Sequence, residues 1–286
     1  MYQLIKIVLI NLVDWSKKEL FKSLSVYTLL GFAKKAFPLL LLPFLTRVLT
    51  PEDYGIMAMF ATVRAFFSPF VDLGAASSVG RYYFDKKELD FPAYLTNVLF
   101  IILASTVFFG SLVLIFSNSI SVLSGVPKSI LWIVIIVSLG TVINRINLTI
   151  YRMQQKSISF AILSIMETVL YFSLMILLVL GFRWNWKADI YTQLFIFSAL
   201  GLWGIYILKK SNLLKATLYL NNDYIKKALA FGLPMFVHTF GLFFVNMTDK
   251  LLITNFIGIE ATGIYSIGFK MATIVVFFVT AYNNAY

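Results

Sequence analysis

Long apolar stretches separated by short polar ones dominate this chain. A helix needs about 20 mainly apolar residues to cross the hydrocarbon core of a bilayer. By that criterion the pattern predicts eight membrane-spanning helices, at residues 24–49, 54–80, 94–117, 130–150, 158–181, 190–208, 228–256 and 262–284. The apolar stretch near the N-terminus is short and is followed by Asp14, so we expect residues 1–21 to be a cytoplasmic segment. The pattern therefore predicts an all-α integral membrane protein.

The amino-acid composition points to the same class of protein. Of the 286 residues, 60% are hydrophobic and 13% are charged, whereas soluble domains are about 25% charged. The chain has no cysteine and one histidine, His238. This excludes disulfides, thiolate nucleophiles and metal sites built from Cys or several His. We therefore expect no cofactor and no bound metal, and we expect His238 to form a hydrogen bond between helices.

The positive charges are distributed unequally between the two sides of the predicted spans. Of the 24 Lys and Arg residues, fifteen lie near span ends on one side, and three, Lys128, Arg183 and Lys187, on the other. Basic loops stay in the cytoplasm, which predicts a cytoplasmic N-terminus. The net charge of +11 is then a property of these loops, so we expect membrane lipids and no nucleic acid as partners.

The chain contains an internal repeat. A shift of 208 positions aligns four identical pairs: Thr46 with Thr254, Glu52 with Glu260, Gly55 with Gly263, and Ile56 with Ile264. Both copies read as a long span, a tight acidic turn and a second span, as expected of parallel repeats in transporters. We therefore predict a six-helix unit at residues 22–208, a basic cytoplasmic linker at 209–227, and the start of a second, incomplete unit at 228–286.

Four basic residues lie close to the middle of predicted spans: Lys34, Lys35, Arg64 and Lys270. A Lys or Arg at the bilayer centre costs about 2.5–3.5 kcal/mol even on the most lenient scale. These side chains must therefore face water, an acidic partner or an anionic ligand. Since neighbouring helical residues point about 100° apart, we expect only one of the two adjacent lysines to face a cavity. The sequence thus predicts a positively charged cavity near the midplane.

Four more charged residues lie within spans but nearer their ends. Arg47 and Lys250 are close enough to the outer surface for their side chains to reach it, so we expect them at the rim of the cavity. Asp72 and Asp249 have two interpretations that the sequence leaves open. They are candidates for carrying a coupling proton or sodium ion, and equally for pairing with Arg64 or Lys250.

Six stretches of the chain carry a family resemblance: residues 42–55 (LPFLTRVLTPEDYG), 72–83 (DLGAASSVGRYY), 151–156 (YRMQQK), 231–234 (FGLP), 249–250 (DK) and 263–266 (GIYS). In order and spacing they resemble the bacterial polysaccharide-export flippases. These are the Wzx-type O-antigen and teichuronic-acid transporters of the multidrug/oligosaccharidyl-lipid/polysaccharide exporter superfamily. The similarity extends over essentially the whole chain.

The resemblance implies two six-helix lobes that give alternating access to a central cavity. It implies that the substrate is an undecaprenyl-pyrophosphate-linked oligosaccharide, moved from the inner to the outer leaflet of the bacterial cell (inner) membrane. The translocated units then serve the assembly of surface polysaccharide such as lipopolysaccharide O-antigen. It also implies that basic residues of the first spans, here Lys34, Lys35 and Arg64, contact the pyrophosphate or acidic sugars. Other membrane proteins of polysaccharide assembly are the expected protein partners. Family members have about twelve to fourteen spans, so we expect the second lobe to continue beyond residue 286.

Other functions remain open at this stage. An ion-coupled drug or metabolite antiporter of the same superfamily would need carboxylates in the cavity, whereas basic residues outnumber acidic ones within the spans. A membrane enzyme of the pathway, such as a polymerase or ligase, would need catalytic residues in a long external loop, which the pattern does not contain. A non-transporting scaffold is a further alternative. We therefore expect a transporter rather than an enzyme.

Overall fold

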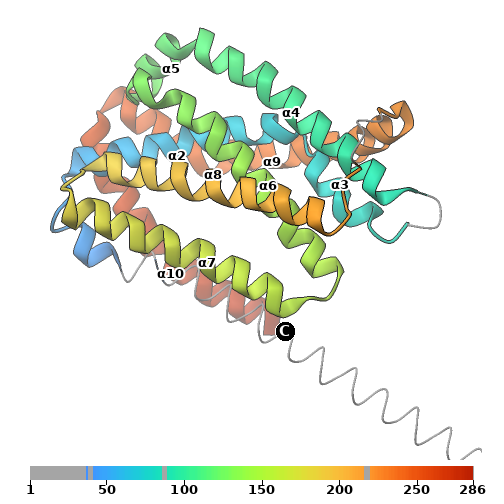
Figure 1. Cartoon of the computed structure of the whole chain (residues 1–286). Helices are drawn as coiled ribbons and strands as arrows, with labels where there is room; N and C mark the ends of the chain where they lie inside the picture. Colours follow the sequence, from blue (N-terminus) through green and yellow to red (C-terminus); the bar gives the residue numbers. More distant parts are fainter. Residues whose placement is uncertain (1–36, 38–40, 86–88, 216–219, 286) are drawn as a thin grey trace, which may run out of the picture.

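The computed structural model describes residues 37, 41–85, 89–215 and 220–285, except the side chains of residues 273–285. The structure is 86% helical and its described residues contain no strand, so the predicted all-α class is confirmed. Figure 1 shows the long helices running alongside one another as a bundle. The helices are α2 (Pro51–Asp72), α3 (Ala75–Tyr82), α4 (Phe91–Ile115), α5 (Ser117–Ser124), the 3-10 turn η1 (Lys128–Ile130), α6 (Leu131–Met153), α7 (Ser157–Ile176) with the π-helical turn η2 (Leu177–Gly181), α8 (Trp186–Lys210), α9 (Asn222–Phe256) and α10 (Ile259–Ala285).

Six segments are long and apolar enough to cross a membrane: Pro51–Asp72, Phe91–Ile115, Lys128–Met153, Ser157–Gly181, Trp186–Lys210 and Asn222–Phe256. They correspond to the second to seventh predicted spans. The eighth corresponds to α10, and the first, at residues 24–49, lies mostly outside the described residues. We call the end of the bundle where α2, α8 and α10 begin the Pro51 end. The opposite end, where α4, α7 and α9 begin, is the Asp90 end.

The predicted span at residues 54–80 is wrong in one respect, because the helix breaks within it. Leu73 and Gly74 have positive φ angles of 48° and 73°, which end α2 and start α3 in a new direction. A Cβ added to Gly74 would lie 2.0 Å from the carbonyl oxygen of Gly232 in α9. Gly74 therefore has two roles: it adopts the positive φ angle of the turn, and its lack of a side chain allows α9 to approach closely.

Two predicted connections are partly helical in the structure. The connection between the predicted spans 94–117 and 130–150 contains most of α5 and the 3-10 turn that follows it. The predicted linker at 209–227 is shorter than expected, because α9 begins at Asn222. The Asn221 side chain accepts a hydrogen bond from the Asp223 amide at 2.9 Å and so caps the helix. A search for apolar windows misses such polar first turns.

The connection between α8 and α9 is attached to the start of α4. The amide of Asn221 donates to the Asn97 side chain at 2.9 Å, and the amide of Lys215 donates to Thr96 Oγ1 at 3.1 Å. The Lys215 ammonium also pairs with Asp90, which caps α4, and this hydrogen bond lowers the pKa of the Asp90 carboxyl below its ordinary value. We call the helices α2 to α8 the first repeat, and α9 and α10 the second repeat. The link between the two repeats is therefore held at the Asp90 end.

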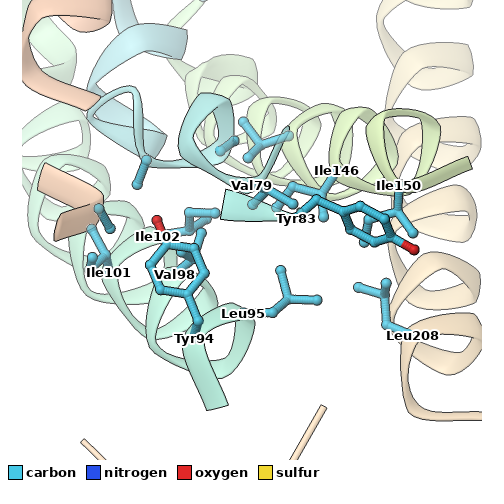
Figure 2. Close-up of a cluster of buried hydrophobic side chains, with 14 of the residues drawn as sticks. Val79, Tyr83, Tyr94, Leu95, Val98, Ile101, Ile102, Ile146, Ile150 and Leu208 are labelled. Carbon is cyan, nitrogen blue, oxygen red and sulfur yellow. The ribbon is translucent and has the colours of Figure 1, made fainter. Parts of the chain in front are cut away.

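Close packing holds the first repeat together. Figure 2 shows a cluster in which side chains of α3, α4, α6 and α8 meet, with Val79, Leu95 and Ile146 fully buried. Lipid tails are as apolar as these side chains, so van der Waals packing rather than removal from water stabilises the contact. The same principle explains the contact of α6 with α8. A Cβ added to Gly140 would lie 2.1 Å from the carbonyl oxygen of Phe197.

The two repeats meet through a reciprocal contact between α2 and α10. A Cβ added to Gly55 would lie 2.0 Å from the carbonyl oxygen of Ile259, and one added to Gly263 would lie 1.9 Å from that of Pro51. The shift of 208 that relates Gly55 to Gly263 also relates Pro51 to Ile259. The contact therefore has approximate two-fold symmetry, which supports the repeat seen in the sequence. It brings the two repeats together at the Pro51 end.

Candidate functional site

A cavity of about 390 Å³ lies between the two repeats. Its walls come from α2, α7 and α8 of the first repeat and from α9 and α10 of the second. The volume is within the range of about 300–1,000 Å³ that is usual for ligand pockets. Each of the five helices contributes at least one polar or charged side chain, and Arg64 is the one charged residue that α2 contributes among the described lining residues.

Arg64 reaches the cavity from a stripe on α2. Met57, Ala61 and Arg64 follow the spacing of one helix face. The guanidinium carbon lies 6.0 Å from the centroid of the Phe197 ring, a cation–π contact. Its Nε is buried without a hydrogen-bond partner among the described residues. The Nε–H group of Arg64 is therefore a buried donor without an acceptor in the described part of the chain.

Two lysines join Arg64 in the cavity. Lys250 on α9 is only 8% exposed, and its Nζ lies 3.3 Å from the sulfur of Met247 and 5.3 Å from the centroid of the Phe269 ring. Lys270 on α10 has its Nζ 5.7 Å from the centroid of the Tyr54 ring. Three cationic side chains from three helices and both repeats thus line one cavity.

Two carboxylates face the same cavity, and each accepts hydrogen bonds from neutral side chains of the described residues. Asp189 on α8 is 5% exposed and accepts hydrogen bonds from the Tyr171 hydroxyl and from Gln193 Nε2, the latter at 2.8 Å. Glu167 on α7 accepts one from Asn144 Nδ2 at 3.1 Å. Among the described lining residues, three cations therefore face two carboxylates, which leaves an excess of one positive charge.

The structure brings together some of the residues predicted for the cavity. Arg64 and Lys270 both line it, and Lys250, predicted at the rim, lies in its wall. Lys34 and Lys35 lie outside the described residues. Arg64 and Lys270 are similar in depth but are not equivalent in the repeat, because the shift of 208 relates Lys270 to Thr62.

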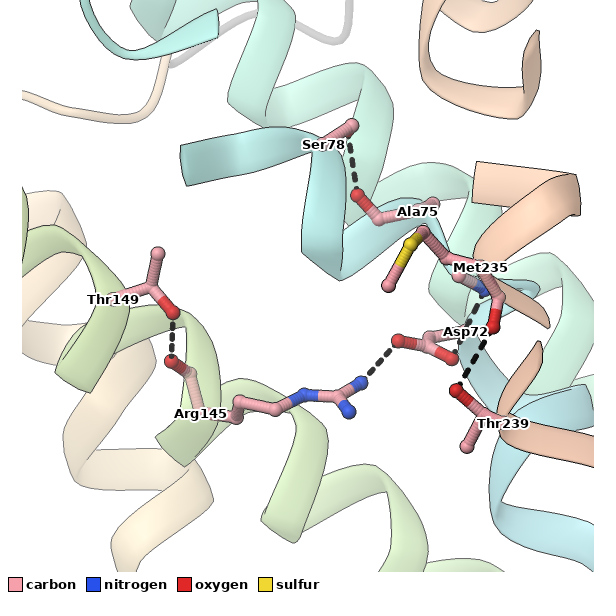
Figure 3. A network of polar contacts seen from close by, with 8 residues as sticks. Asp72, Ala75, Ser78, Arg145, Thr149, Met235 and Thr239 are labelled. Atoms are coloured by element: carbon pink, nitrogen blue, oxygen red, sulfur yellow. Dashed lines mark hydrogen bonds and ion pairs between the residues drawn. The ribbon is translucent and has the colours of Figure 1, made fainter. Parts of the chain in front are cut away.

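Asp72 lies away from this cavity and pairs with Arg145, which lies near the end of the predicted span at residues 130–150. Figure 3 shows the Arg145 guanidinium of α6 reaching the Asp72 carboxylate at the end of α2. The Gly74 amide donates to the same carboxylate at 3.2 Å. The side chain of Asp72 is 5% exposed and that of Arg145 is 49% exposed. The ion pair thus connects the break between α2 and α3 to α6.

Replacing Arg145 with Met is expected to lower the free energy of unfolding by about 1–3 kcal/mol, because it leaves the buried Asp72 carboxylate without its cation. The measurement is a denaturation curve in detergent. Replacing Arg81 with Met is the matched control, since Arg81 makes an exposed pair with Asp85 and should change stability by no more than about 0.5 kcal/mol. Equal effects of the two substitutions would contradict a structural role for the Asp72–Arg145 pair.

The remaining candidates lie outside the cavity lining. Asp249 accepts hydrogen bonds from the Tyr265 hydroxyl and, at 2.8 Å, from the amide of Lys250. Arg47 is exposed in the turn that precedes α2. His238 is exposed on α9 and has no hydrogen bond to the described residues, so the predicted bond between helices is not formed there.

Sequence reasoning missed Asp189 and Gln193. The apolar pattern starts the sixth span at residue 190 and so leaves Asp189 outside it, whereas α8 begins one turn earlier at Trp186. The spacing of Asp189, Gln193 and Phe197 at intervals of four residues was the available signal, because it puts all three on one helix face. This signal could be recognised only once the helix was known to begin before Asp189.

Comparison with known proteins identifies the family of this chain. Residues 20–286 match the family described as polysaccharide biosynthesis protein. The chain belongs to the polysaccharide biosynthesis protein family. The resemblance found in the sequence is thereby confirmed, and six helices apolar enough to span a bilayer make this family member a multi-pass membrane protein.

Two relatives of this family member are from Haemophilus influenzae. A protein named "Uncharacterized membrane protein" is 25% identical over 272 residues, covering 93% of this chain and 64% of that protein. The protein named "Lsg locus putative protein 1" is 24% identical over 277 residues, with coverages of 93% and 65%. The chain therefore spans less than two thirds of the length of these relatives.

A solved structure named "protein A" shares the fold of this family member. The TM-score is 0.60 at 14% sequence identity, and the match covers 89% of this chain and 58% of that chain. At this level of identity the likeness concerns the helix arrangement alone.

Proposed function

We propose that the protein is a flippase that moves undecaprenyl-pyrophosphate-linked oligosaccharide units across the bacterial inner membrane for surface polysaccharide assembly. The cavity carries this proposal. Arg64, Lys250 and Lys270 converge on it from α2, α9 and α10, at the junction of the two repeats. A diphosphate must exchange its hydration for other strong donors to cross a medium of low dielectric constant, and Lys and Arg provide charge-assisted hydrogen bonds.

The position of the cavity supports alternating access. It lies between helices of different repeats, and the α2–α10 contact closes the repeats on each other at the Pro51 end. Relative movement of the repeats would expose the cavity at one end and then at the other. Among the described residues, most of the basic side chains near helix ends lie at the Asp90 end, so in this proposal that end faces the cytoplasm and receives the substrate.

The two carboxylates are the part of the site that would respond to a coupling ion. Asp189 and Glu167 share the cavity with the three cations, so protonation of either one would increase the positive charge offered to an anionic substrate. We propose coupling to H⁺ or Na⁺ at this site rather than at Asp72 or Asp249, which do not line the cavity among the described residues. Other membrane proteins of polysaccharide assembly are the proposed partners that receive the translocated unit.

The test is complementation of a bacterial strain that lacks its O-unit translocase. Cells without a translocase accumulate the lipid-linked intermediate on the cytoplasmic side, and expression of the protein is expected to remove this intermediate and restore surface polymer. Both quantities are measured in the same cells. Persistence of the intermediate, with the protein present in the membrane at normal levels, would contradict the proposed function.

A second candidate function is favoured by Asp189 and Glu167, because carboxylates in a cavity are what an antiporter of cationic drugs or metabolites requires. In that case cells expressing the protein would extrude ethidium in response to a proton or sodium gradient. The excess of cationic side chains in the cavity argues against a cationic substrate. Ethidium efflux without any effect on the lipid-linked intermediate would select the antiporter.

A further inference from the structure

The cavity contains buried polar atoms that have no partner among the described residues. They are Gln193 Oε1, Ser266 Oγ and Arg64 Nε. Gln193 and Ser266 are 6% and 4% exposed, respectively, and both line the cavity. Buried polar groups in native proteins are nearly always hydrogen-bonded, and leaving one unpaired is unfavourable. Three such atoms around one cavity therefore indicate a ligand that supplies their partners.

The hydrogen-bonding capacity of each atom restricts that ligand. The Gln193 amide group already donates to Asp189 through Nε2, which leaves its Oε1 as an acceptor that needs a donor. Arg64 Nε is a donor that needs an acceptor, and the Ser266 hydroxyl can act as either. A ligand that offers only acceptors therefore cannot satisfy all three atoms.

A diphosphate meets only part of this requirement. Its oxygens are acceptors, so it can pair with Arg64 Nε and with the two lysines, but it offers no donor to Gln193 Oε1. In a bound complex, the donor to Gln193 Oε1 would come from another part of the ligand. A sugar provides hydroxyl or acetamido donors next to a diphosphate, and it also has apolar ring faces for Phe172 and Phe269, which line the same cavity.

Building on the proposed function, we infer that Gln193 and Ser266 form a hydroxyl-recognising subsite that selects the sugar attached directly to the diphosphate. Gln193 belongs to α8 of the first repeat and Ser266 to α10 of the second. A sugar bound to both would therefore connect the two repeats, while Arg64, Lys250 and Lys270 hold the diphosphate. Specificity and anion binding are then carried by different residues of one cavity. Sites built to hydrogen-bond a substrate hydroxyl discriminate strongly against analogues that lack it.

The experiment compares two soluble probes, farnesyl diphosphate and the same molecule carrying one N-acetylglucosamine, bound to the full chain in nanodiscs. The unsubstituted protein is expected to bind the sugar-bearing probe at least about tenfold more tightly. Ser266→Ala removes one hydroxyl and is expected to lose most of this gain. Its affinity for farnesyl diphosphate should stay within about threefold of that of the unsubstituted protein. Gln193→Leu is the second variant, and it should have the same selective effect.

Ser138→Ala is the matched control. Ser138 on α6 is also buried with no partner for its hydroxyl among the described residues, but it does not line the cavity. Its replacement should leave the affinities for both probes unchanged. If Ser266→Ala and Gln193→Leu weaken both probes equally, or weaken neither, the two residues do not select the sugar and the subsite is refuted. If the unsubstituted, folded protein binds neither probe, the proposed function itself fails.

Discussion

Replacing Arg64 with alanine is expected to abolish surface-polysaccharide assembly and to accumulate the lipid-linked intermediate, without lowering the amount of protein in the membrane. The guanidinium is the one charged group that α2 contributes to the described cavity lining, and its Nε has no acceptor within the described chain. A hydrogen bond to a charged group contributes about 1.5–3 kcal/mol, which corresponds to a loss of about 10- to 150-fold in affinity for the diphosphate. The measurements are polymer on the cell surface and intermediate in membrane extracts.

Two further variants separate charge from geometry at this position. Arg64→Lys retains the charge but loses the planar set of donors, so an intermediate loss of transport is expected. Arg81→Ala removes an exposed arginine that pairs with Asp85 and should transport normally. Normal polymer levels in Arg64→Ala cells would show that Arg64 does not serve the substrate.

Replacing Gly263 with alanine is expected to open the cavity toward the Pro51 end. The new Cβ would lie 1.9 Å from the carbonyl oxygen of Pro51, so α10 must move away from α2. Overpacking of this kind costs about 1–3 kcal/mol, and it acts on the closed contact alone. Because the chain has no cysteine, a single Ala61→Cys substitution reports access to the cavity. Labelling by an impermeant thiol reagent from the Pro51 side is expected to accelerate at least about tenfold.

The same helix provides the control for this experiment. A Cβ added to Gly268 would meet no atom of the described residues within 4 Å, so Gly268→Ala should leave the labelling rate unchanged. Labelling is measured from both membrane sides, in right-side-out and inside-out vesicles. Equal acceleration from both sides would indicate general loosening of the protein. An unchanged rate in folded Gly263→Ala protein would mean that the glycine contact does not close the cavity.

The helix content and most helix positions could be predicted because a bilayer imposes a simple length and polarity requirement on each span. The break after Asp72 could not, since it depends on the backbone angles of Leu73 and on the approach of Gly232 from a helix about 160 residues away. Helix ends with polar first turns, at Asn222 and Trp186, were also missed. Capping and tertiary packing set those ends, and neither changes the apolar pattern.

The cavity was only partly predictable for a related reason. The free-energy cost of a charged side chain near the bilayer centre identifies Arg64 and Lys270, because an isolated charge within an apolar span must have a partner or a ligand. The same cost does not identify Gln193 or Ser266, because uncharged polar side chains are tolerated at many positions in membrane helices. Their importance comes from the hydrogen bonds that they lack, and a sequence contains no information on that point until neighbouring helices are placed.

The reciprocal contact of Gly55 and Gly263 has the form of an interface between identical subunits. In such an isologous interface each partner presents the same surface to the other. A unit that carries both Pro51 and Gly55 has the two complementary halves of this contact, so two copies could pair through it without any further change. The junction between the two repeats therefore has, within one chain, the geometry of a symmetric dimer contact.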